Sequence, residues 1–182
     1  MKNDPITVRV RLDESLFRRF ALFDAFILGK RWRLPAGFAA ILLVCGVACL
    51  FSGKQQAWLM FALLAVIGIG MPAVYVGTYL HQVKKQSDAF GLKKPRAMYT
   101  VILSKENVTV RNDFKAEPEV TLAWDKIFGA VRVKGAIYLY AVRTRAFILP
   151  NGQSDAADGE VWAYLTSFLP ANRVSDRAGK NV

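Results

Sequence analysis

The sequence predicts an α+β membrane protein. A two-helix transmembrane hairpin follows the first strand of a small β-barrel or sandwich, which ends in a C-terminal helix. Residues 34–51 and 57–80 are apolar and uncharged, and only the five polar residues SGKQQ separate them. Residues 6–12 and much of the chain after residue 98 alternate between apolar and other residues with a period of two. That period is typical of half-buried strands, so strands are expected on both sides of the hairpin.

The two apolar segments are long enough to cross a bilayer. A helix rises 1.5 Å per residue, so they span about 27 and 36 Å, against about 30 Å for the hydrocarbon core. Two buried helices of a soluble protein are the alternative, but too little chain remains to surround them. A cleaved signal around Cys49 is a second alternative, and it would remove an N-terminal part that looks structural.

Basic residues lie next to the apolar segments. The net charge is +11, and most of the excess falls before residue 34 and within 81–97, while Lys54 is the only charge in the connecting loop. The positive-inside rule then predicts a multi-pass protein of the bacterial cytoplasmic (inner) membrane, with both termini cytoplasmic. Residues from 98 onward are nearly neutral and lack a basic stripe with interleaved aromatics, so no nucleic-acid partner is expected.

The N-terminal part, residues 1–33, predicts a strand followed by an amphipathic juxtamembrane helix. The strand is ITVRVRL at 6–12, and Asp13 is a candidate N-cap. Residues 30–33, KRWR, suit the interface at which a chain enters a membrane. One apolar stripe at helical spacing consists of Leu16, Phe20, Phe23 and Ile27.

Small residues in the apolar segments predict close helix packing. Ala73 and Gly77 form a small-xxx-small pair, and Gly46 lies on the other helix. Pro72 is expected to kink its helix. A bent, pore-lining helix is the functional alternative, but an ion path usually leaves a charged residue and neither segment has one. Cys45 and Cys49 share a helix face and are read as small packing residues.

The C-terminal part predicts six strands and a helix. Alternating runs begin near residues 98, 108, 120, 127, 136 and 145, each bounded by turn residues. Val161, Tyr164, Leu165 and Phe168 then predict an amphipathic helix that stops at Pro170. With the N-terminal strand this makes seven strands and one closing helix, a pleckstrin-homology-like (PH-like) arrangement.

The predicted organisation follows from these patterns. It comprises the N-terminal strand and helix (1–33), the hairpin (34–80, with helices 34–51 and 57–80), a basic linker (81–97), a cytoplasmic PH-like β domain (98–170) and a disordered tail (171–182). The N-terminal strand is expected to pair with the β domain, because otherwise a sheet edge stays open.

Residues 121–153 resemble the C-terminal domain of YcxB-like bacterial membrane proteins. The likeness rests on a Trp-acid-aliphatic group, an aromatic-rich strand, and aliphatics ending in proline. The matching residues are Trp124, Asp125, Ile127, Tyr138, Leu139, Tyr140, Ile148, Leu149 and Pro150. The order of strand, hairpin and β domain is also similar. Where the family usually has a basic residue after the proline, Asn151, Gly152 and Gln153 follow here. The resemblance implies an architecture and no established activity.

Catalytic sets are not evident in the sequence. His81 is the only histidine and lies at the predicted membrane edge, and no phosphate loop or HExxH motif occurs. Asp155, Asp158 and Glu160 lie at the start of the last predicted helix, where carboxylates complement the helix dipole. We therefore expect no enzyme activity, no cofactor and no metal.

Basic residues remain as candidate contacts for anionic lipid or another ligand. Loop residues of this kind include Lys105, Lys115 and Lys134. The site candidates are Arg31, Arg33, Lys84, Lys85, Arg143 and Arg145. The predicted function is a membrane-tethered, non-enzymatic module that binds a cytoplasmic protein or lipid headgroups. The alternative is a small accessory or channel-like subunit that forms a homo-oligomer through its helices.

Overall fold

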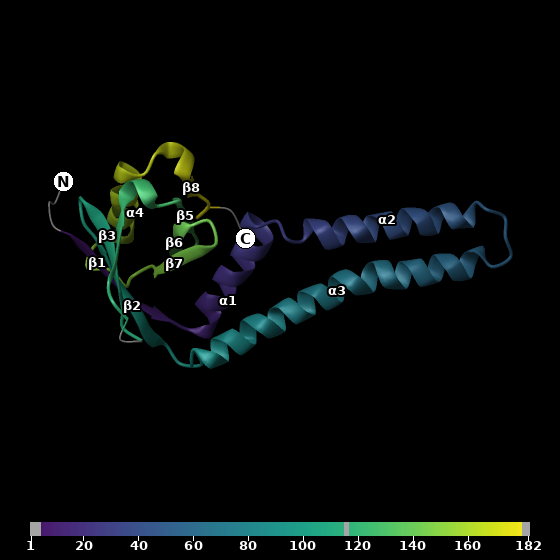
Figure 1. The fold of residues 1–182 in the computed structure, drawn as a ribbon, viewed down its shortest axis with the longest axis horizontal. Coiled ribbons are helices and arrows are strands. Elements are labelled where there is room, and N and C mark those ends of the chain that lie inside the picture. The colour runs from purple at the N-terminus through teal and green to yellow at the C-terminus, as the bar shows by residue number, and fades with distance from the viewer. Residues whose placement is uncertain (1–4, 115–116, 180–182) are drawn as a thin grey trace. The chain divides into compact units, whose positions relative to one another are not determined.

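The computed structural model describes residues 5–114 and 117–179, and its architecture is α+β, as predicted (Figure 1). The helices are α1 (Glu14–Leu22), the π-helix η1 (Phe23–Leu28), α2 (Arg33–Leu50), α3 (Ala57–Ala89), η2 (Trp124–Lys126), α4 (Asp158–Phe168) and η3 (Ala171–Arg173). The strands are β1 (Ile6–Leu12), β2 (Arg96–Leu103), β3 (Asn107–Asn112), β4 (Val120–Ala123), β5 (Gly129–Val133), β6 (Ala136–Val142), β7 (Arg145–Pro150) and β8 (Val174–Asp176).

The chain divides into two compact units. A β unit combines residues up to Phe20 with those from Gly91 onward, and a helical unit comprises Ala21–Phe90. The insertion therefore interrupts the β unit in sequence, between its first strand and the rest. Each unit is described by itself below.

The β unit contains two four-stranded sheets, ordered β1-β2-β3-β4 and β7-β6-β5-β8. Strand β1 pairs antiparallel with β2 from Ile6 opposite Leu103 to Leu12 opposite Arg96, as the sequence predicts. Beyond the ladder, the N–H of Glu14 donates to the Leu92 carbonyl at 2.9 Å. The two ends of the insertion therefore leave the β unit side by side.

Burial follows the period-two pattern in β1 and β3, whereas β6 is buried at five successive residues. Val8 and Val10 of β1, like Val101 and Leu103 of β2, are almost fully buried. Helix α4 contributes Val161 and Leu165, which are also buried. Trp124 stacks on Phe168 of α4 with ring centroids 4.8 Å apart, and its indole N–H donates to the Ser104 carbonyl at 3.0 Å. Trp124 is therefore part of the core.

The helical unit is built on two long helices that pack against each other through glycine. A Cβ at Gly46 of α2 would lie 3.1 Å from the Phe61 ring, and one at Gly68 of α3 would lie 3.4 Å from the Ala39 carbonyl oxygen. Gly46 lies at this contact, as expected. Ala73 and Gly77 were also expected at a close helix contact, but they do not lie at the contact between α2 and α3. Both are exposed, and a Cβ at Gly77 would meet no atom within 4 Å.

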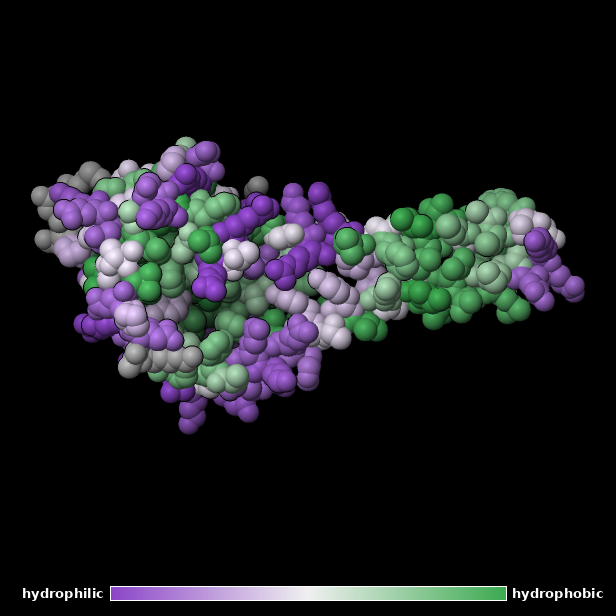
Figure 2. Space-filling view, in the orientation of Figure 1, coloured by the Kyte–Doolittle hydropathy of each residue, from purple (hydrophilic) through white to green (hydrophobic). Residues whose placement is uncertain are grey.

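Both long helices carry apolar side chains on their surfaces, shown in green over α2 and α3 in Figure 2. Leu34 is 85% exposed and Val66 is 70% exposed. In each helix, only 6% of the most apolar 18-residue stretch is buried. A core helix of a soluble protein would be mostly buried. By length and composition, both helices are able to cross a membrane.

Residues 81–89, expected as part of a linker, continue helix α3. Gln and Lys favour helices, and Val83 and Ser87, one turn apart, are both buried. The helix ends where Gly91 adopts a φ of +67°, a conformation that glycine adopts at helix C-termini. The linker is therefore much shorter than 81–97, since β2 begins at Arg96.

One further expectation needs correction. The tail 171–182 was expected to be disordered, but it contains η3 and β8 up to Asp176, and residues 180–182 lie outside the described part. Pro72, which was expected to kink its helix, lies inside α3. In contrast, Asp13 is the N-cap that its position predicts, because its carboxylate accepts the Leu16 N–H at 2.8 Å.

Candidate functional site

The residues after Pro150 form a clamp on the outer edge of β1. The N–H of Arg9 donates to the Gln153 carbonyl at 3.1 Å, and the N–H of Asp155 donates to the Thr7 carbonyl at 3.1 Å. The Asp155 carboxylate also accepts the Thr7 N–H at 2.9 Å. The edge of β1 that does not face β2 is thereby covered.

The side chain of Gln153 completes this clamp. Its carbonyl oxygen accepts the Arg11 N–H at 2.7 Å, and its amide nitrogen donates to the Arg11 carbonyl at 3.1 Å. A side-chain amide carries one acceptor and two donors, so it imitates a neighbouring strand here. A lysine or arginine could not accept the Arg11 N–H. Gln153 therefore has a structural task in a segment where the YcxB-like pattern usually has a basic residue.

The neighbouring edge, that of β7, is covered by a tyrosine. The Tyr99 hydroxyl accepts the Ile148 N–H at 2.7 Å and lies 3.1 Å from the Ile148 carbonyl, to which it donates. Burial raises the pKa of the Tyr99 hydroxyl well above its ordinary value, and the Ile148 backbone only partly opposes this. The hydroxyl stays protonated and can serve as both donor and acceptor.

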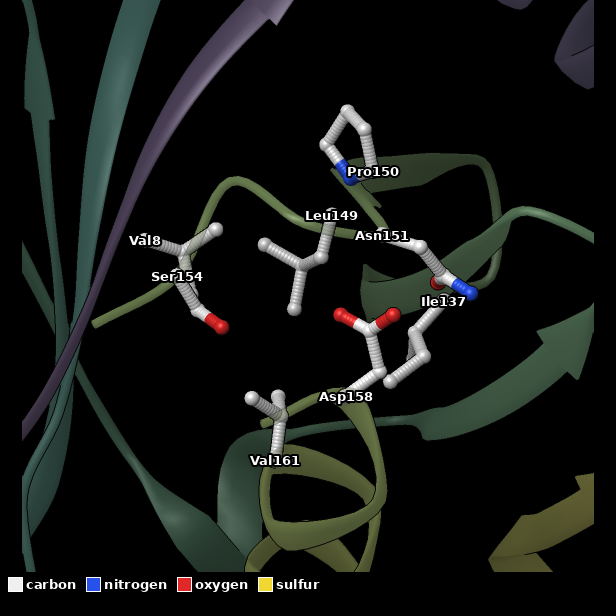
Figure 3. A pocket seen from close by; sticks show the side chains of 8 residues that line it. All are labelled: Val8, Ile137, Leu149, Pro150, Asn151, Ser154, Asp158 and Val161. Carbon is white, nitrogen blue, oxygen red and sulfur yellow. The ribbon is translucent and has the colours of Figure 1, made fainter. Parts of the chain in front are cut away.

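A small cavity lies behind the clamp (Figure 3). Its lining residues are Val8, Ile137, Leu149, Pro150, Asn151, Ser154, Asp158 and Val161. Its volume is about 10 Å³, room for about one water molecule. The Asp158 carboxylate accepts a hydrogen bond from the Gly152 N–H at 2.8 Å, and the Ser154 hydroxyl donates one to the Ala156 carbonyl. A water can fit here, but an organic substrate cannot.

The acidic residues near α4 act on backbone groups. Asp155 binds β1, Asp158 binds Gly152, and Glu160 accepts the Ala157 N–H at 3.4 Å. The sequence reading of helix-dipole partners is right in position for Asp158 and Glu160 but misses the role of Asp155. Across residues 5–114 and 117–179, no group of three or more His, Cys, Asp or Glu side chains is placed to hold a metal ion.

The basic candidates of the helical unit do not form one cluster along the helix axis. Arg31, Arg33, Lys84 and Lys85 are all exposed. The glycine contacts of α2 and α3 give an antiparallel register that sets Arg33 beside about residue 76 of α3. Lys84 and Lys85 then lie roughly 12 Å farther along the helix. That distance exceeds the screening length of about 8 Å at physiological ionic strength, so the two pairs act separately.

The candidates of the β unit lie at one hairpin tip. Arg143 and Arg145 flank Thr144 between β6 and β7, and all three are exposed. Within the described part of the chain, neither arginine side chain forms a hydrogen bond or ion pair, although Arg145 is paired with Val142 in the β6–β7 ladder. Lys134 is likewise exposed, in the turn between β5 and β6, while Lys115 lies outside the described residues.

Two residues that organise the β unit were missed by sequence reasoning. They are Gln153 and Arg173, which the sequence places among polar residues that resemble an ordinary loop and a polar tail. The only signals were a glutamine shortly after a strand and an arginine three residues after Pro170, and neither pattern indicates a partner. Both side chains bind backbone groups far away in sequence.

Comparison of the chain with protein-family models, with curated proteins and with solved structures finds no match. The geometry alone must therefore carry the functional argument. It offers a β unit in which the edges of β1 and β7 are covered, an exposed apolar helix pair and basic side chains on the surface of both units.

Proposed function

We propose that the protein is a membrane-tethered, non-enzymatic interaction module of the bacterial cytoplasmic membrane. In this proposal, α2 and α3 cross the bilayer and the β unit binds a cytoplasmic protein or lipid headgroups. The observation that carries it is the exposed apolar surface of the two helices, beside a β unit that is complete only when β1 joins across the insertion.

Water is an unfavourable environment for this helix pair. Leaving one large apolar side chain exposed forgoes about 1.5–3 kcal/mol of burial free energy, and many such side chains are exposed here. Trp32 precedes α2 and Trp58 lies at the start of α3 on the opposite side of the apolar stretch. Tryptophan favours both interfaces of a bilayer, so these positions fit a spanning pair.

The orientation is argued from charge. Arg31 and Arg33 flank one end of the helix pair, and Lys84 and Lys85 follow the apolar part of α3, whereas the 52–56 loop carries only Lys54. The positive-inside rule puts the loop outside and both termini in the cytoplasm. The functional surface is then on the β unit, because a five-residue loop is too short to build a site.

The β unit supports a PH-like assignment by its order of elements. Four antiparallel strands form one sheet, β5 to β7 form the antiparallel part of the other, and α4 follows them. The PH-like arrangement has seven strands and a closing helix, and strand β8, which follows α4, is an addition to it. The proposed relationship to YcxB-like proteins rests on the sequence motifs alone.

Two classes of partner fit the basic residues. Each basic side chain near an anionic membrane surface contributes about 1 kcal/mol of attraction, which suits Arg31 and Arg33. Arg143 and Arg145 present two guanidinium groups that suit a phosphate or carboxylate. We favour a protein partner, because lipid attraction at the helix ends is already explained by the orientation of the hairpin.

Co-purification from native membranes in mild detergent tests this function. A reproducible soluble partner, weakened by Arg143→Glu with Arg145→Glu but not by the loop control Lys54→Glu, is the expected result. Flotation with vesicles that contain or lack anionic lipid distinguishes a headgroup from a protein. If neither a protein nor anionic vesicles bind, the module assignment is wrong.

A channel-like or accessory homo-oligomer is the second candidate. It is favoured by Gly70 and Gly77 of α3, where an added Cβ would meet nothing within 4 Å, so that another helix could approach closely. A defined oligomer with conductance in planar bilayers would support this candidate over the module.

A further inference from the structure

Strand β8 is the last described strand and is weakly built. It has three residues and pairs parallel with β5 at one edge of its sheet. Parallel pairs are slightly less stable per residue than antiparallel pairs. Val174 and Ser175 are only half-buried, and Asp176 is exposed. A short terminal strand thus covers the edge of β5, whose own residues are almost all buried.

Strand β5 is shaped for the close approach of an extended chain. A Cβ at Gly129 would lie 2.5 Å from the Arg173 carbonyl oxygen, which no side chain tolerates. Glycine inside a strand often marks a site where another backbone approaches closely. Here that backbone is the segment entering β8.

Two charged side chains fix the register of this segment. The Arg173 guanidinium donates to the carbonyls of Asp125 and Ile127, at 2.9 and 3.1 Å. The Asp176 carboxylate lies 3.6 Å from the Arg132 guanidinium, and both side chains are partly exposed. Residues 173–176 therefore present an arginine, an aliphatic residue, a small polar residue and an acid.

We propose that the edge of β5 is a binding site for an extended peptide segment of a protein partner with this pattern. Residues 171–177 of the chain occupy the edge in cis until such a segment displaces them. In strand addition, main-chain hydrogen bonds give affinity and side-chain contacts give specificity. The inference rests on the proposed function as an interaction module. It adds a second binding surface, apart from Arg143 and Arg145, and names the class of partner for it.

The N–H of Arg177 also donates to the Arg132 carbonyl at 2.9 Å. Displacement is nevertheless feasible, because the ladder between β5 and β8 is short and parallel and the β8 residues are only partly buried or exposed. The ion pair between Arg132 and Asp176 is solvent-accessible, and such pairs contribute little and weaken with salt. The tethered segment nevertheless competes at a high local concentration, about millimolar for a short flexible link. The intact chain should therefore bind a peptide in trans more weakly than a chain whose own segment is loosened.

The test uses a fluorescent peptide with the sequence of residues 171–179, ANRVSDRAG, and the full chain in mild detergent. Fluorescence polarisation is compared for the wild-type chain, for Arg173→Ala with Asp176→Ala, and for the control Lys54→Ala in the exposed 52–56 loop. We expect the double variant to bind at least tenfold more tightly than wild type, and the control to equal wild type. A peptide with alanine at both charged positions should lose binding. Adding Gly129→Val to the double variant should also abolish binding.

Equal binding by the wild type and the double variant, or no binding by a double variant with wild-type near-ultraviolet circular dichroism, overturns the inference. A tail-dependent dimer of the wild-type chain would identify a second copy as the occupant and overturn it as well. These failures leave co-purification of a partner through another surface intact, so they differ from failure of the proposed function. The altered peptide requires no change in the protein, which keeps the test decisive even if Gly129→Val does not fold.

Discussion

At the residue scale, the stability of the β unit depends on side chains that imitate backbone. Gln153 offers Arg11 a donor and an acceptor, and Tyr99 does the same for Ile148. Exposed strand edges are prone to pairing with other chains. Covering β1 and β7 in this way protects the seam at which the sheets meet and retains a strand that residues 13–95 separate from the rest.

Replacing Gln153 tests the clamp. Gln153→Ala removes both hydrogen bonds to Arg11 and should lower the free energy of unfolding by about 1 kcal/mol, because the freed groups can still reach water. Hydrogen exchange of the β1 amides should accelerate, with Arg11 affected most. Gln55→Ala, in the exposed loop, is the control. Unchanged exchange at Arg11 would show that the clamp does not stabilise β1.

Asp13 gives a prediction that depends on pH. Burial raises the pKa of its carboxyl, but hydrogen bonds from Leu16 and Ser15 and the charge of Arg19 outweigh this, so the net shift is downward. A lowered pKa means that the stabilisation is fully present above the ordinary pKa of 3.8 and is lost as pH falls through the folded value.

Asp13→Ala should therefore cost about 1 kcal/mol at pH 7, and the difference from wild type should shrink below about pH 4. Urea titrations in detergent micelles at pH 7 and pH 3, followed by near-ultraviolet circular dichroism, measure both values. A difference that is the same at both pH values contradicts the assignment of the carboxylate as the helix cap.

At the element scale, the sequence predicted the elements well and their ends poorly. All seven expected strands occur, and burial alternates along β1 and β3 as the sequence does. The extension of α3 to Ala89 was missed because its apolar residues are sparse, and only the buried positions Val83 and Ser87 reveal its packed face. Strand β8 was missed because three residues of mixed polarity carry no period. Arg173 and Gln153 could not be assigned, since their partners are backbone groups distant in sequence.

Contact between the long helices gives a prediction for glycine. Gly46→Val should weaken the α2–α3 pair by about 1–3 kcal/mol, because its Cβ would press on Phe61. Gly77→Val adds the same atoms where no neighbour lies within 4 Å and should have little effect on this pair. SDS titration in mixed micelles, with a fluorescence-transfer pair on the two helices, measures both. Equal loss in the two variants would mean that Gly46 does not lie at the contact.

At the scale of the whole molecule, the sequence order is explained by the pairing of β1 with β2. A long insertion costs only slightly more closure entropy than a short one, since the cost grows with the logarithm of its length. The insertion here begins and ends at adjacent points, as the bond from Glu14 to Leu92 shows. A helix pair can therefore be inserted in a bilayer while β1 stays paired with β2. The β unit then remains folded and able to bind a partner.

Cysteine accessibility in spheroplasts tests this account most directly. In a chain with Cys45→Ala and Cys49→Ala, a single cysteine is placed in the loop by Lys54→Cys or in the β unit by Lys134→Cys; both positions are exposed. A membrane-impermeant maleimide should label Lys54→Cys in intact spheroplasts and Lys134→Cys only after permeabilisation. Labelling of Lys134→Cys in intact spheroplasts, or protection of Lys54→Cys, would contradict a hairpin that holds a cytoplasmic β unit at the membrane.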